Sequence, residues 1–228
     1  MALAIFVNCD KQNTMSQNLQ DYRKSYEKGE LSEENVSGNP LKQFQEWFDS
    51  AEKSSEVDEV NAMTLSTIGI DGFPRGRVVL LKEFSEEGFI FYTNYESEKG
   101  ISINSNPHIC LSFFWPTLER QISIKGIAEK ISEEKSTAYF HSRPKGSQLG
   151  ALVSEQSSEV ENREVLEKRL RDLEATYENK EVPKPKKWGG FLISPIEFEF
   201  WQGRKNRLHD RIQYKKTGDS WKIYRLQP

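Results

Sequence analysis

The chain has 228 residues, and its 32 basic and 35 acidic side chains nearly cancel to a formal net charge of −3. This length suits one good-sized core, and the balanced charge offers no overall attraction for nucleic acid. The two cysteines, Cys9 and Cys110, are too few for a disulfide framework and are expected to be free thiols. No apolar run reaches the length of a membrane span, and residues 2–7 do not resemble a secretory signal. We therefore expect a cytoplasmic protein without membrane contact.

Residues 9–38 are polar and rich in amide side chains, which is typical of a mobile arm. We predict such an arm over residues 1–38 and a single domain over residues 39–228. Within the arm, Arg23 and Tyr26 are close enough in sequence to share one helical face, although an unstructured tail is the alternative.

The first predicted helix covers residues 39–53. Pro40 suits a first helical turn, and Leu41, Phe44 and Trp47 follow at helical spacing, so one face of the helix is apolar. Further helices are predicted over residues 97–106, over 132–142, in a short stretch from Pro144, and over 162–178.

Short runs of apolar and β-branched residues between turn residues predict the strands. They cover residues 62–70, 76–84, 89–94, 109–115, 121–131, 188–193, 198–202, 212–215 and 221–226. The first three follow one another through tight turns, which predicts an antiparallel meander because no crossover would fit between them. A barrel closes so many antiparallel strands without long exposed edges, so we predict a mainly β barrel with peripheral helices.

The motifs of several enzyme classes are missing from the sequence. It contains no G-x-G-x-x-G, no Walker loop, no G-x-S-x-G, and no cysteine or histidine pair at metal-binding spacing. A metal site is therefore not expected. Four clusters of polar and aromatic residues remain, and each is suited to hold an anion.

The first cluster is Arg77 and Lys82, which would point to opposite faces of a regular strand and so serve different groups. Charges that guard the strand ends against aggregation are the alternative. The second cluster is Tyr92 and Thr93, followed by Lys99 where a helix is expected to begin. Free N–H groups at a helix start bind phosphate readily.

The third cluster is Tyr139, Arg143 and Ser147. Tyr139 and Arg143 share one face of a predicted helix, and Ser147 falls in the first turn after Pro144. The phenol, the guanidinium and the hydroxyl would together clamp an oxyanion.

The fourth cluster lies in residues 198–211, where Trp201, Arg207, His209 and Arg211 accompany the end of an apolar run. Arg207 and His209 alternate by two, so they would point the same way in a strand. A solvated loop with ordinary salt bridges and a structural histidine are the alternatives. Two phosphate sites beside an aromatic surface favour a flat phosphorylated cofactor such as FMN, which faces a phosphorylated substrate.

A series of motifs runs from residue 40 to the C-terminus in the order R-V-V-L-L-K, F-Y-T-N, S-F-F-W, L-E-R-Q, Y-F-H-S-R-P-x-x-S-Q-x-G, Q-S-S, W-G-G-F, E-F-W-Q-G, R-L-H-D-R and W-K-I-Y-R-L-x-P. In this order they strongly resemble the pyridoxamine 5'-phosphate oxidase family. The resemblance implies a homodimeric, FMN-binding split β-barrel with its active sites at the subunit interface. It also implies oxidation of pyridoxamine 5'-phosphate and pyridoxine 5'-phosphate by oxygen to pyridoxal 5'-phosphate and hydrogen peroxide.

The resemblance also implies which residues contact the cofactor and the substrate. FMN contacts would come from Arg77, Val78, Val79, Leu80, Leu81, Lys82, Tyr92, Thr93, Lys99, Gln121, Gln156, Ser157, Trp201 and Arg211. Substrate contacts would come from Lys82, Tyr139, Arg143, Ser147, Arg207, Leu208, His209, Arg23 and Tyr26. Arg207 and His209 would be catalytic and lie over the pyridine ring, and the segment of Arg23 and Tyr26 would close over the site.

One residue departs from the family pattern. Glu98 stands where many relatives have an arginine just before the lysine at the helix start. A carboxylate close to a phosphate repels it, so we predict weaker FMN retention unless the Glu98 side chain turns away.

Two rival functions stay open beside the oxidase. An FMN-dependent reductase on the same barrel would act on another substrate, which the complete set of substrate-phosphate residues disfavours. A carrier of FMN or pyridoxal 5'-phosphate would bind without consuming oxygen.

Overall fold

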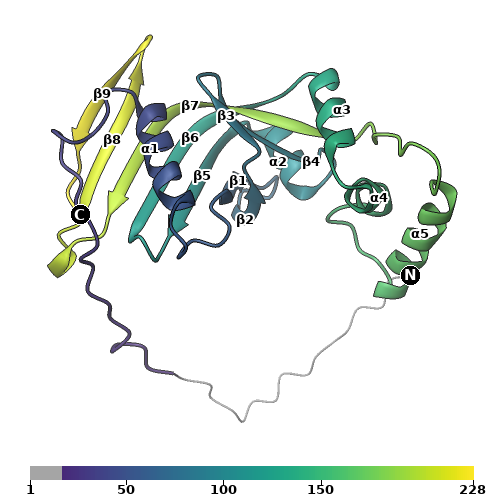
Figure 1. Cartoon of the computed structure of the whole chain (residues 1–228), viewed down its shortest axis with the longest axis horizontal. Helices are drawn as coiled ribbons and strands as arrows, with labels where there is room; N and C mark the ends of the chain where they lie inside the picture. The colour runs from purple at the N-terminus through teal and green to yellow at the C-terminus, as the bar shows by residue number, and fades with distance from the viewer. Residues whose placement is uncertain (1–16) are drawn as a thin grey trace.

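The structure, a computed structural model, describes residues 17–228, so residues 2–7 and Cys9 lie outside it (Figure 1). The helices are α1 (Pro40–Glu52), α2 (Glu98–Ser105), α3 (Glu133–Ser142), α4 (Lys145–Val153) and α5 (Arg163–Thr176). The strands are β1 (Ala62–Ile68), β2 (Pro74–Leu80), β3 (Glu83–Ser85), β4 (Gly88–Asn94), β5 (His108–Trp115), β6 (Arg120–Lys130), β7 (Trp188–Gln202), β8 (Asp210–Thr217) and β9 (Ser220–Arg225). A single 3-10 turn, η1 (Lys205–Arg207), precedes β8. No helix among residues 17–228 has the length and apolarity to cross a membrane.

Helix α1 confirms the helix predicted over residues 39–53. Asn39 caps it, because its side chain accepts a hydrogen bond from Leu41 N, and Pro40 occupies the first turn. Phe44 is fully buried and packs edge-on against Phe89, with ring centres 4.9 Å apart. The apolar face of α1 thereby joins the core on one face of the sheet.

All strand pairs in the described residues are antiparallel, and they form a single sheet in the order β2-β1-β5-β6-β7-β4-β3, with β8 and β9 added beside β7. β7 is the spine of this sheet, since it pairs with β6 along its length, with β4 in its first half and with β8 in its second half. The sheet curls as a half-barrel with the helices at its periphery, which confirms the predicted fold class (Figure 1).

Two details of the strand prediction were wrong. Residues 62–94 do not form a three-stranded meander. The antiparallel pair of β1 and β2 is confirmed, but the order of the sheet places β2 at one edge and the hairpin of β3 and β4 at the other, with β1 pairing β5 and β4 pairing β7. The runs over 188–193 and 198–202 are one continuous strand, in which a register shift opposite Lys125 and Gly126 leaves Ile196 without a partner. Local turn signals fix neighbours in sequence, but the pairing of distant strands depends on the whole core.

A second, smaller apolar cluster attaches the helical section to the sheet. Phe140 of α3, Leu149 of α4 and Val182 pack around Trp188 at the start of β7. This cluster fixes the junction of α3 and α4 against β4 and β7, where the candidate site begins.

Candidate active site

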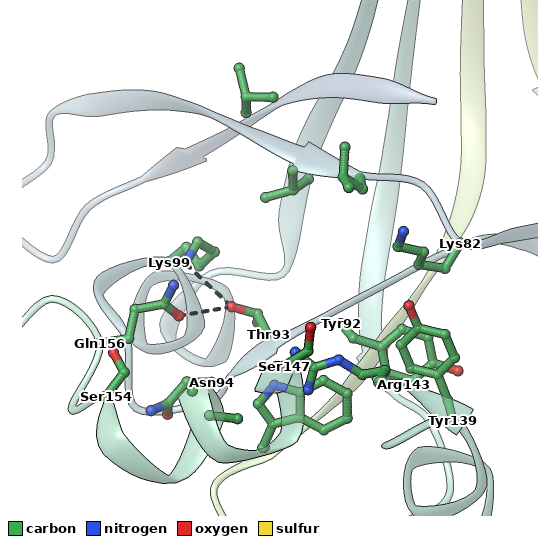
Figure 2. A pocket seen from close by; sticks show the side chains of 16 residues that line it. Lys82, Tyr92, Thr93, Asn94, Lys99, Tyr139, Arg143, Ser147, Ser154 and Gln156 are labelled. Atoms are coloured by element: carbon green, nitrogen blue, oxygen red, sulfur yellow. Dashed lines mark hydrogen bonds between the residues drawn. The ribbon is translucent and has the colours of Figure 1, made fainter. Parts of the chain in front are cut away.

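A cavity of about 500 Å³ opens between β2, β4 and helices α2 to α4 (Figure 2). Its volume lies in the usual range of small-molecule sites. The residues that line it include these assigned from the sequence: Val78, Val79, Leu80, Lys82, Tyr92, Thr93, Lys99, Tyr139, Arg143, Ser147 and Gln156. We call this space the anion cavity. Leu81 does not line it, because its side chain is buried in the main core.

Lys99 lies at one side of the anion cavity, in the first turn of α2. Its Nζ is 3.3 Å from Thr93 Oγ1 and 3.4 Å from Ser97 Oγ, and no ion pair of the described residues includes it. The side chain is buried, and desolvation together with nearby Arg77 lowers the pKa of Lys99. A buried ammonium that meets only hydroxyl groups, beside the free N–H groups of a helix start, is suited to bind an anion.

Arg77, Gln156 and Ser157 surround the same helix start. Arg77 Nη1 donates to Thr67 Oγ1 at 2.7 Å, and burial lowers the pKa of this guanidinium. Gln156 Oε1 accepts a hydrogen bond from Thr93 Oγ1 at 3.2 Å, and Ser157 Oγ accepts one from the first backbone N–H of α2 at 3.2 Å. Cofactor residues assigned from distant segments of the sequence therefore lie together at the start of α2.

Glu98 is directed to β2 by an ion pair. Its Oε1 lies 2.7 Å from Arg75 Nε, and the two terminal nitrogens of Arg75 donate to the Asp71 carboxylate at 3.0 and 2.6 Å. The Glu98 charge is thus offset by a guanidinium that sequence reasoning had not assigned. The effect of Glu98 on FMN affinity stays a prediction.

Arg143 lies at another side of the cavity, at the C-terminal end of α3 (Figure 2). Its guanidinium carbon lies 4.8 Å from the centre of the Trp188 ring, and burial lowers its pKa. Arg143 Nη1 is buried and has no hydrogen-bond partner among residues 17–228. Buried polar atoms without a partner are rare because they cost free energy of folding, so this nitrogen is suited to pair with a bound anion.

Aromatic rings and neutral donors accompany Arg143. The rings of Tyr92 and Tyr139 stack with centres 3.8 Å apart, and Tyr92 lies 5.5 Å from Trp188. Burial, followed by the charge of Glu83, raises the pKa of Tyr92 to about 12, so its hydroxyl stays a neutral donor. Figure 2 shows Ser147 and Lys82 reaching this side of the cavity as well.

A second group of assigned residues lies on the sheet. Gln121, Trp201 and Arg211 are register partners on β6, β7 and β8, so their side chains form one row across the sheet. Arg211 Nε donates to Glu199 Oε1 at 2.8 Å, and this bond raises the pKa of Arg211. The His209 ring lies 4.6 Å from the Trp201 ring. We call Gln121, Trp201, Arg207, His209 and Arg211 the C-terminal face.

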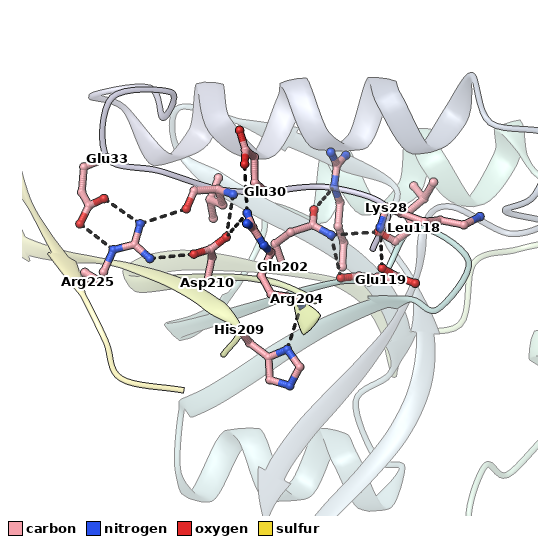
Figure 3. Close-up of polar contacts among 12 residues, drawn as sticks. Lys28, Glu30, Glu33, Leu118, Glu119, Gln202, Arg204, His209, Asp210 and Arg225 are labelled. Carbon is pink, nitrogen blue, oxygen red and sulfur yellow. Dashed lines mark hydrogen bonds and ion pairs between the residues drawn. The ribbon is translucent and has the colours of Figure 1, made fainter. Parts of the chain in front are cut away.

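One tautomer of His209 is selected by the backbone. The N–H of Arg204 donates to His209 Nδ1 at 3.1 Å, so the neutral ring carries its proton on Nε2 (Figure 3). Burial, followed by the charge of Arg207, lowers the pKa of His209. The imidazole is therefore neutral at pH 7 and offers an N–H donor from Nε2.

The predicted alternation of Arg207 and His209 along a strand was wrong. Both precede β8, and the backbone has positive φ at Asn206 (58°) and Arg207 (61°), so it is not extended. The solvated-loop alternative describes Lys205 correctly, since it pairs with Glu27 at 3.2 Å on the surface. Leu208, assigned to the substrate, is 68% exposed.

The two arm residues assigned to the substrate differ in position. The Tyr26 ring lies 5.7 Å from both the Trp201 and the His209 rings. Arg23 is exposed and donates from Nε to Gln20 O at 2.9 Å. No helix forms in residues 17–38, where a shared helical face had been one alternative.

In a single chain, the anion cavity and the C-terminal face do not share a pocket. None of the five residues of the C-terminal face lines the cavity. Figure 1 shows α3 to α5 at one end of the molecule and β8 and β9 at the other. Each chain thus carries two separate groups of site residues.

Comparisons with known proteins agree on one family. The family model described as pyridoxamine 5'-phosphate oxidase matches residues 50–177, and one described as the pyridoxine 5'-phosphate oxidase C-terminal dimerisation region matches residues 188–228. A Flavobacterium johnsoniae protein named pyridoxine/pyridoxamine 5'-phosphate oxidase is 59% identical over 209 residues, which cover 91% of this chain and 98% of that one. The chain belongs to the pyridoxamine 5'-phosphate oxidase family.

Other members of this oxidoreductase family are similar over the same span. A Salinibacter ruber protein named pyridoxine/pyridoxamine 5'-phosphate oxidase is 49% identical over 214 residues, covering 92% of this chain and 99% of that one. The crystal structure of PhzG from Burkholderia lata, in complex with tetrahydrophenazine-1-carboxylic acid, has a TM-score of 0.80 and 28% identity, and covers 86% of this chain and 95% of that one. The family region described as a dimerisation region contains the C-terminal face except Gln121.

Some residues of the site were missed by sequence reasoning. Asn94, Ser154 and Trp188 line the anion cavity, and Arg75 pairs with Glu98 beside it. Trp188 begins the W-G-G-F motif of the family, which was a usable signal. The partner of Arg75 depends on how β2 meets α2, and no local pattern indicates this.

Proposed function

We propose that this chain uses FMN and oxygen to oxidise pyridoxamine 5'-phosphate and pyridoxine 5'-phosphate to pyridoxal 5'-phosphate, with release of hydrogen peroxide. With the amine substrate, water would also be consumed and ammonia released, because the oxidised product is an imine that must be hydrolysed. The single observation that carries the proposal is that two cations, the buried Lys99 and the half-buried Arg143 with its enclosed Nη1, line one cavity without any carboxylate partner among residues 17–228. A cavity with two such cations suits two phosphate groups, one of a cofactor and one of a substrate.

The residues around α2 fit the phosphate of FMN. Lys99, Arg77 and Ser157 would hold it, together with the backbone N–H groups at the helix start. When bound, the flavin would accept two electrons from the substrate carbon and pass them to oxygen. Exposed Val78 and the backbone of β2 would lie along its ring system.

The residues around Arg143 fit the substrate phosphate. Arg143 would pair with it through the unpartnered Nη1, with Lys82, Tyr139 and Ser147 as further donors. Neutral Tyr92 stacks behind Tyr139 and keeps this wall of the cavity rigid. These contacts would orient a small phosphorylated ring without a covalent bond to the protein.

Arg207 and His209 would act on the pyridine ring. His209 would donate a hydrogen bond from Nε2, because its Nδ1 is already occupied by the Arg204 N–H. Arg207 would add positive charge beside it, and Tyr26 would cover both and exclude water.

These two groups of residues would meet in a homodimer, where the C-terminal face of one chain covers the anion cavity of its partner. The family model supports this, since residues 188–228 match a dimerisation region. Large apolar side chains are also exposed near both groups, among them Val78 at 68%, Phe114 at 56% and Leu208 at 68%. A subunit interface would bury these side chains.

A direct experiment tests the proposed function. The purified chain, loaded with FMN, is mixed with pyridoxamine 5'-phosphate, and oxygen uptake and hydrogen peroxide are measured. We expect uptake with the phosphorylated amine and little with pyridoxamine itself at the same concentration. Flavin binding without oxygen uptake would favour the carrier and contradict the proposal.

A further inference from the structure

A buried carboxylate lies outside the site described so far. Glu119, in the turn between β5 and β6, is 2% exposed, and its backbone has a positive φ of 56°. Non-glycine residues rarely adopt this conformation, so the surrounding structure must hold it in place. Gly203 N donates to Glu119 O at 2.8 Å, and Gln202 Nε2 donates to the same oxygen at 3.2 Å, as Figure 3 shows for Gln202.

The Glu119 side chain binds the N-terminal arm. Its Oε2 accepts hydrogen bonds from two successive backbone N–H groups, that of Glu27 at 2.7 Å and that of Lys28 at 2.9 Å. Figure 3 shows the bond from Lys28. Its Oε1 lies 3.9 Å from Lys24 Nζ. Hydrogen bonds to a buried carboxylate are stronger than those between neutral groups, so this contact is a firm attachment point in an otherwise exposed segment.

This attachment places Tyr26 on the C-terminal face. Tyr26 precedes the two bonded residues, and its ring meets Trp201 and His209 edge-on. Gly203 makes the close approach possible, because a Cβ atom there would lie 2.8 Å from Tyr26 Cβ and 3.0 Å from Glu119 Cβ. We call residues 24–31 the docked segment.

A second carboxylate holds the other end of the docked segment. Asp210 Oδ2 accepts the backbone N–H of Leu31 at 3.0 Å and lies 3.1 Å from Arg204 Nη1. The same arginine donates its backbone N–H to His209 Nδ1. The docked segment and the catalytic imidazole therefore share one hydrogen-bonded connection.

We propose that Glu119 is a positioning residue that holds the docked segment closed over Trp201 and His209. It touches neither ring itself and acts through Tyr26. The structural part of this inference stands on the contacts above, and its kinetic part rests on the proposed function. Without the Glu119 carboxylate, the docked segment would detach at Tyr26 while the sheet beneath it stays folded.

Trypsin tests the structural part, because Arg23, Lys24 and Lys28 are cleavage sites in or next to the docked segment. Full-length Glu119→Ala, with FMN bound, is digested under native conditions, and cleavage at these sites is timed by mass spectrometry. We expect roughly tenfold faster cleavage than in the wild type, because two charge-assisted hydrogen bonds are lost. Glu119→Gln should give a smaller increase, since its amide oxygen can still accept both N–H groups.

Two further variants keep the test decisive. Gly203→Ala keeps the Glu119 carboxylate in the sequence but crowds both Tyr26 and Glu119 Cβ, so the docked segment should loosen and cleavage should also accelerate. It carries the test by itself if Glu119→Ala does not fold. Glu56→Gln is the matched control, because Glu56 pairs with the same Lys28 at 2.7 Å but is exposed, and its loss should leave the cleavage rate unchanged. Wild-type rates in folded Glu119→Ala and Gly203→Ala, or equal acceleration in Glu56→Gln, would overturn the inference.

Steady-state kinetics test the functional part on the same proteins. In Glu119→Ala, KM for pyridoxamine 5'-phosphate should rise several-fold, on the order of 3- to 10-fold, and Glu119→Gln should recover most of this loss. A general loss of structure would not be rescued in this way. If the wild type oxidises no substrate, the proposed function fails while the protease result still decides the role of Glu119. An active wild type with unchanged KM in Glu119→Ala would overturn the kinetic part alone.

Discussion

The anion cavity and the C-terminal face both contain arginines and aromatic rings, but their charges are arranged in different ways. In the cavity, Lys99 is buried and Arg143 is half-buried with its Nη1 enclosed, and neither has a carboxylate partner among the described residues. On the C-terminal face, Arg211 pairs with Glu199; beside that face, Arg204, whose backbone N–H bonds His209, pairs with Asp210 and Glu30. A cation without a carboxylate partner can form an ion pair with a bound anion, whereas a paired cation holds other side chains in place.

This difference predicts that the two groups of residues have different roles, one in ligand affinity and one in turnover. Under the proposed function, the cavity would supply binding energy for phosphate groups, and its cations should govern affinity. The C-terminal face would supply a fixed ring arrangement, with the tautomer of His209 set by the Arg204 N–H, and should govern turnover. The following predictions test this division.

The largest effect is expected from Arg143→Ala. Loss of the guanidinium removes a charge-assisted contact to the substrate phosphate, so KM for pyridoxamine 5'-phosphate should rise about 100-fold while kcat changes little. Arg163→Ala, which removes an exposed arginine paired with Glu167, is the control and should behave as the wild type. A loss confined to kcat would contradict the division.

Lys99→Met should mainly weaken the cofactor. The variant keeps the length of the side chain but loses its charge, so the Kd of FMN should rise roughly 10- to 30-fold, as measured by fluorescence titration of the apoprotein. As the pH rises, the wild-type affinity for FMN should begin to fall before the ordinary lysine pKa of 10.5 is reached. Burial and the charge of Arg77 lower the pKa of Lys99, so its ammonium loses its proton earlier. Unchanged affinity in Lys99→Met would show that the phosphate lies elsewhere.

His209→Asn should lower turnover. An amide can still donate a hydrogen bond but lacks the fixed ring beside Trp201, so kcat should fall about tenfold with little change in KM. Stopped-flow measurement of flavin reduction would separate this step from substrate binding. An unchanged reduction rate together with a raised KM would assign His209 to binding instead.

The pH profile should carry the signature of His209. The pKa of this residue is lowered below the usual value of about 6.5, so the ring is neutral at pH 7 and becomes charged only at lower pH. The value of kcat should therefore be constant through neutral pH and fall on the acid side, below about pH 6.5. Arg207→Ala removes a positive neighbour, so the acid limb of the remaining activity should move to higher pH. An acid limb that moves to lower pH would contradict the influence of the Arg207 charge on His209.

The smallest effect is expected from Glu98→Gln. The ion pair with Arg75 already offsets much of the Glu98 charge, and Glu98 is half-exposed, so FMN affinity should improve only about two- to threefold. The gain should vanish in high salt. An improvement of more than tenfold would mean that Glu98 faces the phosphate directly.

The helices and strands were predicted from the sequence better than the pairing of the strands. The helix with Phe44 and Trp47 and most strands were confirmed, because their apolar spacing reports burial directly. Beyond the hairpin of β1 and β2, the predicted meander was wrong, because β1 and β4 pair with strands that are distant in sequence, β5 and β7. The same limit applied to Glu119, whose partners are nearly a hundred residues away in the arm.

The candidate site shows the same pattern. The motif around Tyr139, Arg143 and Ser147 indicated one wall of the cavity, because the three residues are close in sequence. They lie in α3, at its C-terminal end and in α4. The extended backbone assumed for Arg207 and His209 was wrong, since positive φ values at Asn206 and Arg207 leave no clear mark in the sequence. The separation of the two groups of site residues within one chain needed the structure.

The most direct test of the account uses mixed dimers of Arg143→Ala and His209→Asn. The two variants are co-expressed with different affinity tags, and the mixed species is isolated by both tags. If the C-terminal face of one chain completes the cavity of the other, one of the two sites has no substitution, and kcat/KM should return to about half of the wild-type value per dimer. A mixed species no more active than the average of the two variants would contradict the account.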